Sequence, residues 1–92
     1  MHTVSIHASH PAIVKRLKRV EGHLRAVIEM IESGRPCADI AQQMQAIESA
    51  VTKAKKVLIH DHIDHCLERI AVGTARTSRA SVQEFKGITK YL

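Results

Sequence analysis

The stretch CADIAQQMQAIESAVTKAKKVLIHDHIDHCLERI, residues 37–70, decides the fold of this chain. Its apolar residues recur mostly at steps of three or four, which is the period of one helix face. No glycine or proline interrupts the pattern before Gly73. The spacing therefore predicts one helix of about 34 residues, roughly 50 Å long at 1.5 Å per residue. The residues of this apolar face are Ile40, Met44, Ile47, Val51, Ala54, Leu58 and Ile63.

A shorter helix is expected on each side of the long one. Apolar residues spaced by three or four across residues 12–32 predict an amphipathic helix that begins near Ser9 and Pro11 and ends at Gly34. A loop over residues 73–78 precedes a third helix from about residue 79 to 90. The prediction is an all-α subunit of three helices, forming one domain over residues 1–92, with a flexible segment at residues 1–9.

The composition excludes several other classes of protein. With 92 residues the chain is too short for a second domain. Phe85 and Tyr91 are its only aromatic residues, which disfavours a β-sandwich and an aromatic platform for single-stranded nucleic acid. The 14 lysines and arginines exceed the 9 acidic residues and give a net charge of +5. This charge favours a polyanionic partner such as nucleic acid.

The sequence has neither a membrane span nor a secretion signal. A span needs about 18 uncharged apolar residues in a row, and residues 1–11 lack the apolar core of a signal. A cytoplasmic protein without a membrane partner is expected. No nucleophile–base pairing or nucleotide-binding loop is visible, so we expect no enzyme activity.

The long helix exceeds what its neighbour can cover. The helix over residues 12–32 spans about 32 Å, against roughly 50 Å for the long helix. Apolar residues at the far end therefore stay exposed in a single chain. The simplest remedy is a two-fold dimer in which two antiparallel helical hairpins form a four-helix bundle.

A pair of metal-ligand residues stands near the end of the long helix. His62 and Cys66 are four residues apart, so their side chains lie on one helix face and can bind one ion together. Imidazole and thiolate suit Cu(I), Zn(II) or Ni(II) and are poor ligands for Mg(II) or Ca(II). Simple packing of a histidine and a cysteine in a helical bundle is the alternative interpretation.

The second cysteine opens the same helix. Cys37 precedes His62 by 25 residues, which is about 37 Å along a helix, whereas ligands of one ion lie within about 4 Å. The three residues cannot meet within one chain, but in an antiparallel dimer Cys37 of one subunit can approach His62 and Cys66 of the other. The spacing predicts a site that bridges two subunits. The N-terminal histidines can add a ligand or belong to a disordered tail; they are His2, His7 and His10.

Basic residues gather at two places in the sequence. One group lies in the first helix, and the other lies in the middle of the long helix. On one face of a dimer these groups can contact DNA phosphates about one helical turn apart, or they are simply solvated helix faces. The first group is Lys15, Arg16, Lys18 and Arg19, and the second is Lys53, Lys55 and Lys56.

Three stretches of the sequence form motifs that are similar to those of a known family. The motifs are VKRLKRVEGHL at residues 14–24, Cys37 followed by AQQ at residues 41–43, and IHDHIDHC at residues 59–66. Over residues 11–92 the chain resembles the CsoR/RcnR/FrmR family of metal-sensitive transcriptional repressors. The resemblance implies an all-helical dimer that assembles into a tetramer, represses genes of metal efflux or detoxification, and leaves its operator DNA when the inducer binds.

The resemblance also implies which residues hold the inducer. By position, Cys37, His62 and Cys66 match the Cys-His-Cys triad of the copper(I)-sensing branch, so Cu(I) is the expected inducer. Glu84 resembles the glutamate that orients the ligand histidine. A nickel-sensing branch has a similar triad with an added histidine from the N-terminal segment, so a Ni(II)- or Co(II)-sensing repressor with such a ligand is the alternative. The persulfide-sensing branch uses two cysteines 29 residues apart, as here, and a thiol-reactive sensor acting through Cys37 and Cys66 is a third interpretation.

Similarity to the family extends to basic residues for operator DNA. Arg16 and Lys56 match basic positions that the family uses, and Lys15, Arg19 and Lys53 are expected neighbours on that surface. The sequence contains no helix-turn-helix. Contacts are therefore expected mainly to the phosphates and the shape of double-stranded DNA.

Overall fold

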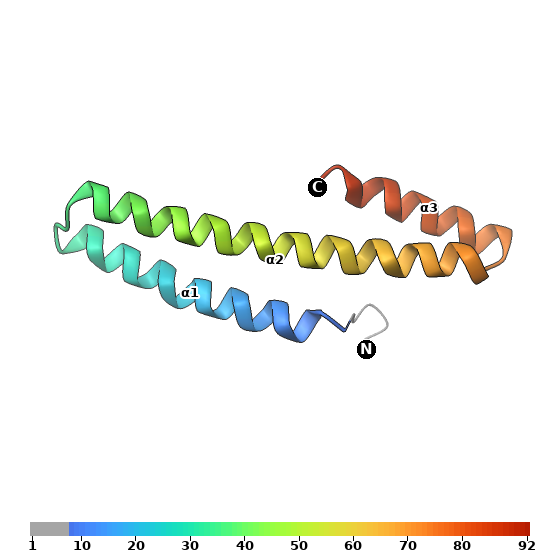
Figure 1. Ribbon diagram of the computed structural model, residues 1–92, viewed down its shortest axis with the longest axis horizontal. Coiled ribbons are helices and arrows are strands. Elements are labelled where there is room, and N and C mark those ends of the chain that lie inside the picture. Colours follow the sequence, from blue (N-terminus) through green and yellow to red (C-terminus); the bar gives the residue numbers. More distant parts are fainter. Residues whose placement is uncertain (1–7) are drawn as a thin grey trace. The chain divides into compact units, whose positions relative to one another are not determined.

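A computed structural model describes residues 8–92, and the regular structure in that range is helical. Helix α1 runs over His10–Glu32, α2 over Cys37–Val72 and α3 over Ala75–Thr89 (Figure 1). The expected all-α subunit of three helices is confirmed. Within residues 8–92, no helix has an apolar stretch long enough to cross a bilayer.

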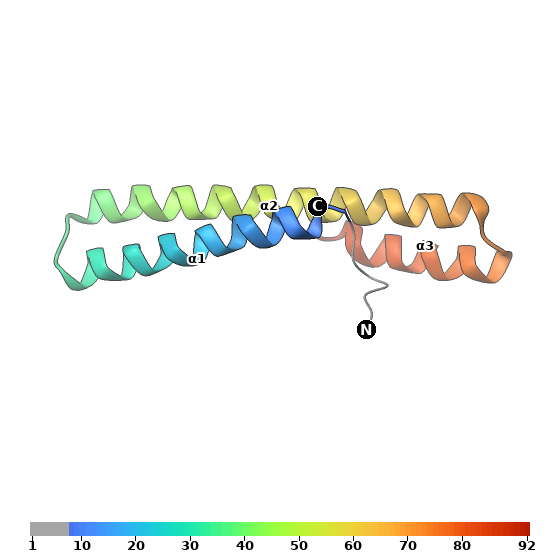
Figure 2. The same cartoon turned by 90° about the horizontal axis from the view of Figure 1, so that it is seen from below.

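The chain forms two compact units, and α2 contributes to both. In the Pro11–Lys55 unit, α1 lies beside the first part of α2 (Figures 1 and 2). The other unit comprises Lys56–Leu92 with residues 8–10, and there α3 lies beside the second part of α2. Helix α2 is continuous over 36 residues, close to the length expected from its apolar spacing.

The turn between α1 and α2 depends on a glycine in the left-handed region. Gly34 has φ of 76° and follows the end of α1 by two residues. The Gly34 N–H donates to the Ile31 carbonyl at 3.1 Å, and the Arg35 N–H donates to the Met30 carbonyl at 2.9 Å. This pair of bonds is a Schellman motif, which satisfies the last carbonyls of the helix. The predicted stop at Gly34 is confirmed.

Replacing this glycine should destabilise the fold. A Gly34→Ala protein is expected to lose about 1 kcal/mol of unfolding free energy, because a Cβ disfavours positive φ. Gly87→Ala is the matched control: it makes the same chemical change inside α3, where nothing lies within 4 Å of the added Cβ, and should stabilise by about 0.5–1 kcal/mol. Urea unfolding at equal protein concentration measures the stability of both variants. Equal effects of the two changes would contradict the role given to the positive φ of Gly34.

Helix α3 begins earlier than the sequence pattern predicted. The cluster of Gly, Thr and Ser at residues 73–78 indicated a loop, but the helix starts at Ala75 rather than near residue 79. The Ser78 N–H donates to the Thr74 carbonyl at 2.8 Å, which is the first bond of the helix. Thr74 therefore occupies the N-cap position that threonine favours, and only two residues separate α2 from α3.

Each unit buries few apolar side chains. Ile13, Val27 and Ala54 are buried in the Pro11–Lys55 unit, and Ile59 and Cys66 are buried in the other. Large apolar residues on α1 and α2 remain exposed, because one chain offers nothing to cover them. An apolar surface of this kind marks an interaction site. These exposed residues include Leu17, Leu24, Ile28, Ile31, Met44, Val51 and Leu67.

Candidate functional site

Helix α3 brings a carboxylate to the His62–Cys66 pair on α2. One donor atom from each of His62, Cys66 and Glu84 lies within 4.8 Å of the other two. The Cys66 thiol donates a hydrogen bond to Glu84 Oε2 at 3.8 Å, and the same oxygen is 3.9 Å from His62 Nε2. The fold thus gathers an imidazole, a thiol and a carboxylate at one place, which we call the His62–Cys66–Glu84 cluster.

Arg69 adds a positive charge to this cluster. Its Nη1 atom is 3.5 Å from Glu84 Oε2. Burial raises the pKa of the Cys66 thiol, and the charge and hydrogen bond of Glu84 raise it further, while Arg69 acts in the opposite direction. The Cys66 thiol therefore keeps its proton at neutral pH in the absence of metal. Sequence reasoning missed Arg69, although its spacing of three from Cys66 places both on one helix face.

The donors of the cluster fit a soft or borderline metal ion. Bonds from such ions to imidazole nitrogen and thiolate sulfur are about 2.0 to 2.3 Å long, so two ligand atoms of one ion lie at most about 4.6 Å apart. The donor atoms of the cluster are gathered within nearly this distance. Imidazole and thiolate together favour Cu(I), Ni(II) or Zn(II) over hard cations.

The other predicted sulfur ligand is not part of the cluster. Cys37 is the first residue of α2, belongs to the Pro11–Lys55 unit and is exposed. Its role as a ligand therefore stays a prediction.

Ser9, directly before α1, contacts the part of α2 that carries the cluster. His2 and His7 lie outside the described residues, whereas His10 begins α1. The residue before it, Ser9, donates to Asp61 Oδ2 both from its hydroxyl and, at 3.4 Å, from its backbone N–H. Asp61 directly precedes His62, so these bonds hold Ser9 against this part of α2.

The two cysteines should differ strongly in reactivity. Iodoacetamide is expected to modify Cys37 well before Cys66, because Cys37 is exposed whereas Cys66 is fully buried and has a raised pKa. Only the thiolate attacks such reagents, and burial hides it further. Mass spectrometry of peptides from reduced, metal-free protein measures both rates, with urea-unfolded protein as the control in which the rates converge. Faster labelling of Cys66 than of Cys37 in the folded protein would contradict the burial and the raised pKa of Cys66.

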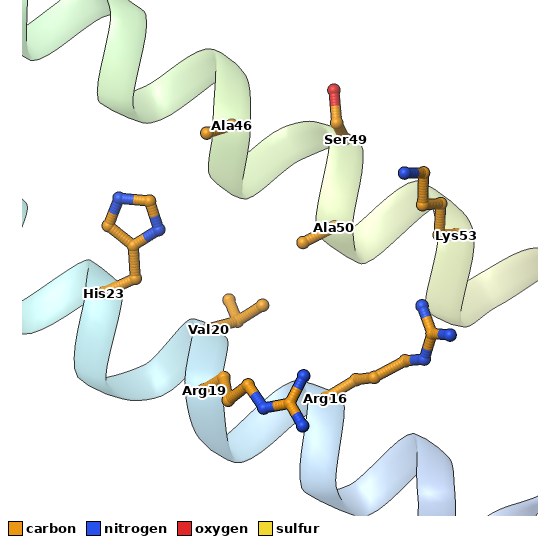
Figure 3. Close-up of a pocket in the computed structure, with 8 residues that line it drawn as sticks. All are labelled: Arg16, Arg19, Val20, His23, Ala46, Ser49, Ala50 and Lys53. Atoms are coloured by element: carbon orange, nitrogen blue, oxygen red, sulfur yellow. The ribbon is translucent and has the colours of Figure 1, made fainter.

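A basic hollow lies between α1 and the first part of α2. It has a volume of about 390 Å³, and none of the residues lining it is acidic. Figure 3 shows the Arg16 side chain reaching toward α2, whereas the Lys53 side chain extends from that helix in a different direction. Such a hollow favours an anion such as a phosphate. Its lining residues are Arg16, Arg19, Val20, His23, Ala46, Ser49, Ala50 and Lys53.

The hollow contains three of the five basic residues that the sequence assigned to DNA. Lys15 and Lys56 do not line it. His23 does, and its Nε2 is 2.7 Å from Gln43 Oε1, a distance at which an Nε2–H donates to the amide oxygen. Sequence reasoning missed His23, although its spacing of seven from Arg16 and four from Arg19 places all three on one face of α1.

Comparison with known proteins identifies the class to which this helical subunit belongs. The family model described as metal-sensitive transcriptional repressor matches residues 9–91. The chain belongs to this family. Its members are transcriptional repressors rather than enzymes, and repression implies binding to DNA.

Individual relatives are associated with two different metals. The chain is 35% identical over 80 residues to the copper-sensing transcriptional repressor CsoR of Bacillus subtilis, covering 85% of this chain and 79% of the relative. It is 37% identical over 59 residues to CsoR of Mycobacterium tuberculosis, covering 64% of this chain and only 50% of that relative's length. The structure of the nickel-responsive transcriptional regulator InrS superposes with a TM-score of 0.79 at 28% identity, covering 97% of this chain and 98% of the other.

Proposed function

We propose that this chain is a Cu(I)-responsive repressor that binds operator DNA without metal and leaves the DNA when Cu(I) binds. The observation that carries the proposal is the His62–Cys66–Glu84 cluster in a chain of the metal-sensitive repressor family. Departure of the protein would allow transcription of genes for metal efflux or resistance.

The proposed ligands of Cu(I) are Cys37 of one subunit and His62 and Cys66 of another. Two thiolates and one imidazole suit Cu(I), which prefers soft donors. Glu84, whose oxygen is 3.9 Å from His62 Nε2, is placed to accept a hydrogen bond from that nitrogen and so leaves Nδ1 as the ligand atom. Bound Cu(I) would supply a positive charge and bonds that join two subunits.

The proposal requires an assembly of several chains. Helix α2 is continuous from Cys37 to Val72, so one chain cannot fold back to bring its own Cys37 to Cys66. The exposed apolar faces of α1 and α2 support a four-helix-bundle dimer that buries them, with a tetramer as the form that binds DNA. Each dimer then carries two equivalent sites.

The basic hollow supplies the proposed contact with operator DNA. Arg16, Arg19 and Lys53 surround it, and guanidinium and ammonium groups are the usual partners of phosphate oxygens. Metal and DNA then bind preferentially to different shapes of the same bundle. By linkage, the factor by which Cu(I) lowers the affinity for DNA equals the factor by which DNA lowers the affinity for Cu(I).

Ni(II), or Co(II), is the second candidate inducer. Two observations favour it: the resemblance to the nickel-responsive InrS, and the bonds that join Ser9, directly before His10, to Asp61, directly before His62. A histidine from the N-terminal segment would give a set of two nitrogen and two sulfur ligands, which suits Ni(II) in a square-planar site.

Anaerobic titration of the reduced protein separates these candidates. Cu(I) and Ni(II) are added in turn to the protein bound to labelled DNA from upstream of its own gene, while fluorescence anisotropy and the absorption spectrum are recorded. Release at one Cu(I) per chain, without release by Ni(II), supports the proposal. Release by Ni(II) that is lost when His2, His7 and His10 are replaced supports the nickel alternative, and release by an oxidant or persulfide alone makes the protein a thiol sensor.

A further inference from the structure

Ser81 on α3 is a polar side chain with no evident structural partner. It is fully buried, and its hydroxyl finds no hydrogen-bond partner within the part of the chain that the structure describes. A buried hydroxyl without a partner destabilises a fold, and alanine would fill the same place on a helix without that cost. Unpaired buried groups are rare in native proteins, and one explanation for them is a partner that becomes available when an ion binds.

Two contacts between α2 and α3 fix where Ser81 lies along α2. The Ser78 hydroxyl donates to the Ile70 carbonyl at 3.2 Å, and Glu84 lies against His62 and Cys66. The helices therefore run antiparallel, and Ser81 stands halfway between Ser78 and Glu84 on the same face of α3. This register places Ser81 level with Cys66 along the helix pair. Cys66 is also fully buried in this unit, and its sulfur can accept a hydrogen bond.

We propose that the Ser81 hydroxyl donates a hydrogen bond to the Cys66 sulfur when that sulfur is a metal ligand. In the metal-free chain the Cys66 thiol itself donates to Glu84 Oε2, so its sulfur is a weak acceptor and the hydroxyl stays unpaired. A metal-bound thiolate carries negative charge and accepts such a bond strongly. Ser81 is then a positioning residue that strengthens metal binding and weakens the metal-free fold. The inference rests on the proposed metal site.

The test compares Ser81→Ala with Ser78→Ala in the reduced full-length chain. Ser78 is the matched control, since it lies one turn away on the same helix and already has a backbone partner. Urea unfolding measures the stability of the metal-free protein, competition with a chromophoric chelator measures Cu(I) affinity, and the ultraviolet sulfur-to-copper band reports on the sulfur.

We expect Ser81→Ala to leave the metal-free protein at least as stable as the parent while lowering Cu(I) affinity about tenfold. The sulfur-to-copper band should move to longer wavelength, because the hydrogen bond that stabilised the sulfur electrons is gone. Ser78→Ala should reduce stability and leave both the affinity and the band unchanged.

Three results would overturn the inference. One is parent-like Cu(I) affinity in Ser81→Ala; another is an unshifted band; the third is an equal loss of affinity in both variants, which would assign the effect to packing. Failure of the proposed function looks different, because the parent protein itself would then bind no Cu(I) at this site or would stay on operator DNA when Cu(I) is added.

Discussion

A Cys37→Ala protein is expected to bind operator DNA as tightly as the parent and to stay bound when Cu(I) is added. The change removes one of two proposed sulfur ligands and leaves the basic hollow intact, since Cys37 does not line it. Loss of an outer partner of a metal ligand already lowers metal affinity about 10- to 100-fold, so loss of a ligand should cost at least about 100-fold. Anisotropy of labelled operator, with and without Cu(I), measures both effects. Release of this variant at the parent's Cu(I) concentration would exclude Cys37 as a ligand.

Mixed subunits test whether the site bridges two chains. Cys37→Ala and Cys66→Ala proteins should each fail to bind Cu(I) tightly. In a mixed dimer, however, the Cys37→Ala chain supplies His62 and Cys66, and the Cys66→Ala chain supplies Cys37. One of the two sites is therefore complete. Random pairing of equal amounts makes about half of the dimers mixed, and each mixed dimer has one of its two sites complete. The mixture should therefore regain roughly a quarter of the parent's tight Cu(I) binding. A mixture that forms dimers without regaining any site would place all ligands within one chain.

The fold follows from the sequence because each helix carries its own signals. Apolar spacing over residues 37–70 predicts α2, and Gly34 predicts the end of α1 through the positive φ that the turn requires. The predicted start of α3 was wrong because threonine and serine favour both loops and helix N-caps. Only the bond from the Ser78 N–H to the Thr74 carbonyl decides between the two.

The site was predictable only where its residues share one helix. The spacing of His62 and Cys66 is readable from the sequence, and the position of Glu84 beside them was implied by the family resemblance. Contacts between residues of different helices were not predictable from the sequence. The ion pair of Arg69 with Glu84, for example, depends on the register of α2 against α3. The same register decides that Ser81 is buried, since nothing in its neighbours along the chain distinguishes it from Ser78.

The second large effect is expected at the basic hollow. A protein with both Arg16→Ala and Lys53→Ala should bind operator DNA on the order of a hundred- to a thousandfold more weakly near physiological salt. Each cation that neutralises a phosphate contributes about 0.9 to the slope of log affinity against log salt, so each dimer of the DNA-bound tetramer, with two such cations missing from each subunit, should make the slope shallower by about 3 to 4. Cu(I) affinity should stay at the parent's value, because neither residue belongs to the His62–Cys66–Glu84 cluster.

A control with the same loss of charge shows whether position matters. Lys18→Ala combined with Arg25→Ala also removes one lysine and one arginine from each chain, but both residues lie on α1 outside the hollow. If the hollow seats phosphates, this control should lose far less affinity than the Arg16 and Lys53 variant. Equal losses, with equal changes of slope, would mean that DNA responds to the net charge of the helices. The distinction is physical: a diffuse field attracts DNA anywhere on a basic surface, whereas converging cations hold individual phosphates and thereby fix how the duplex lies on the protein.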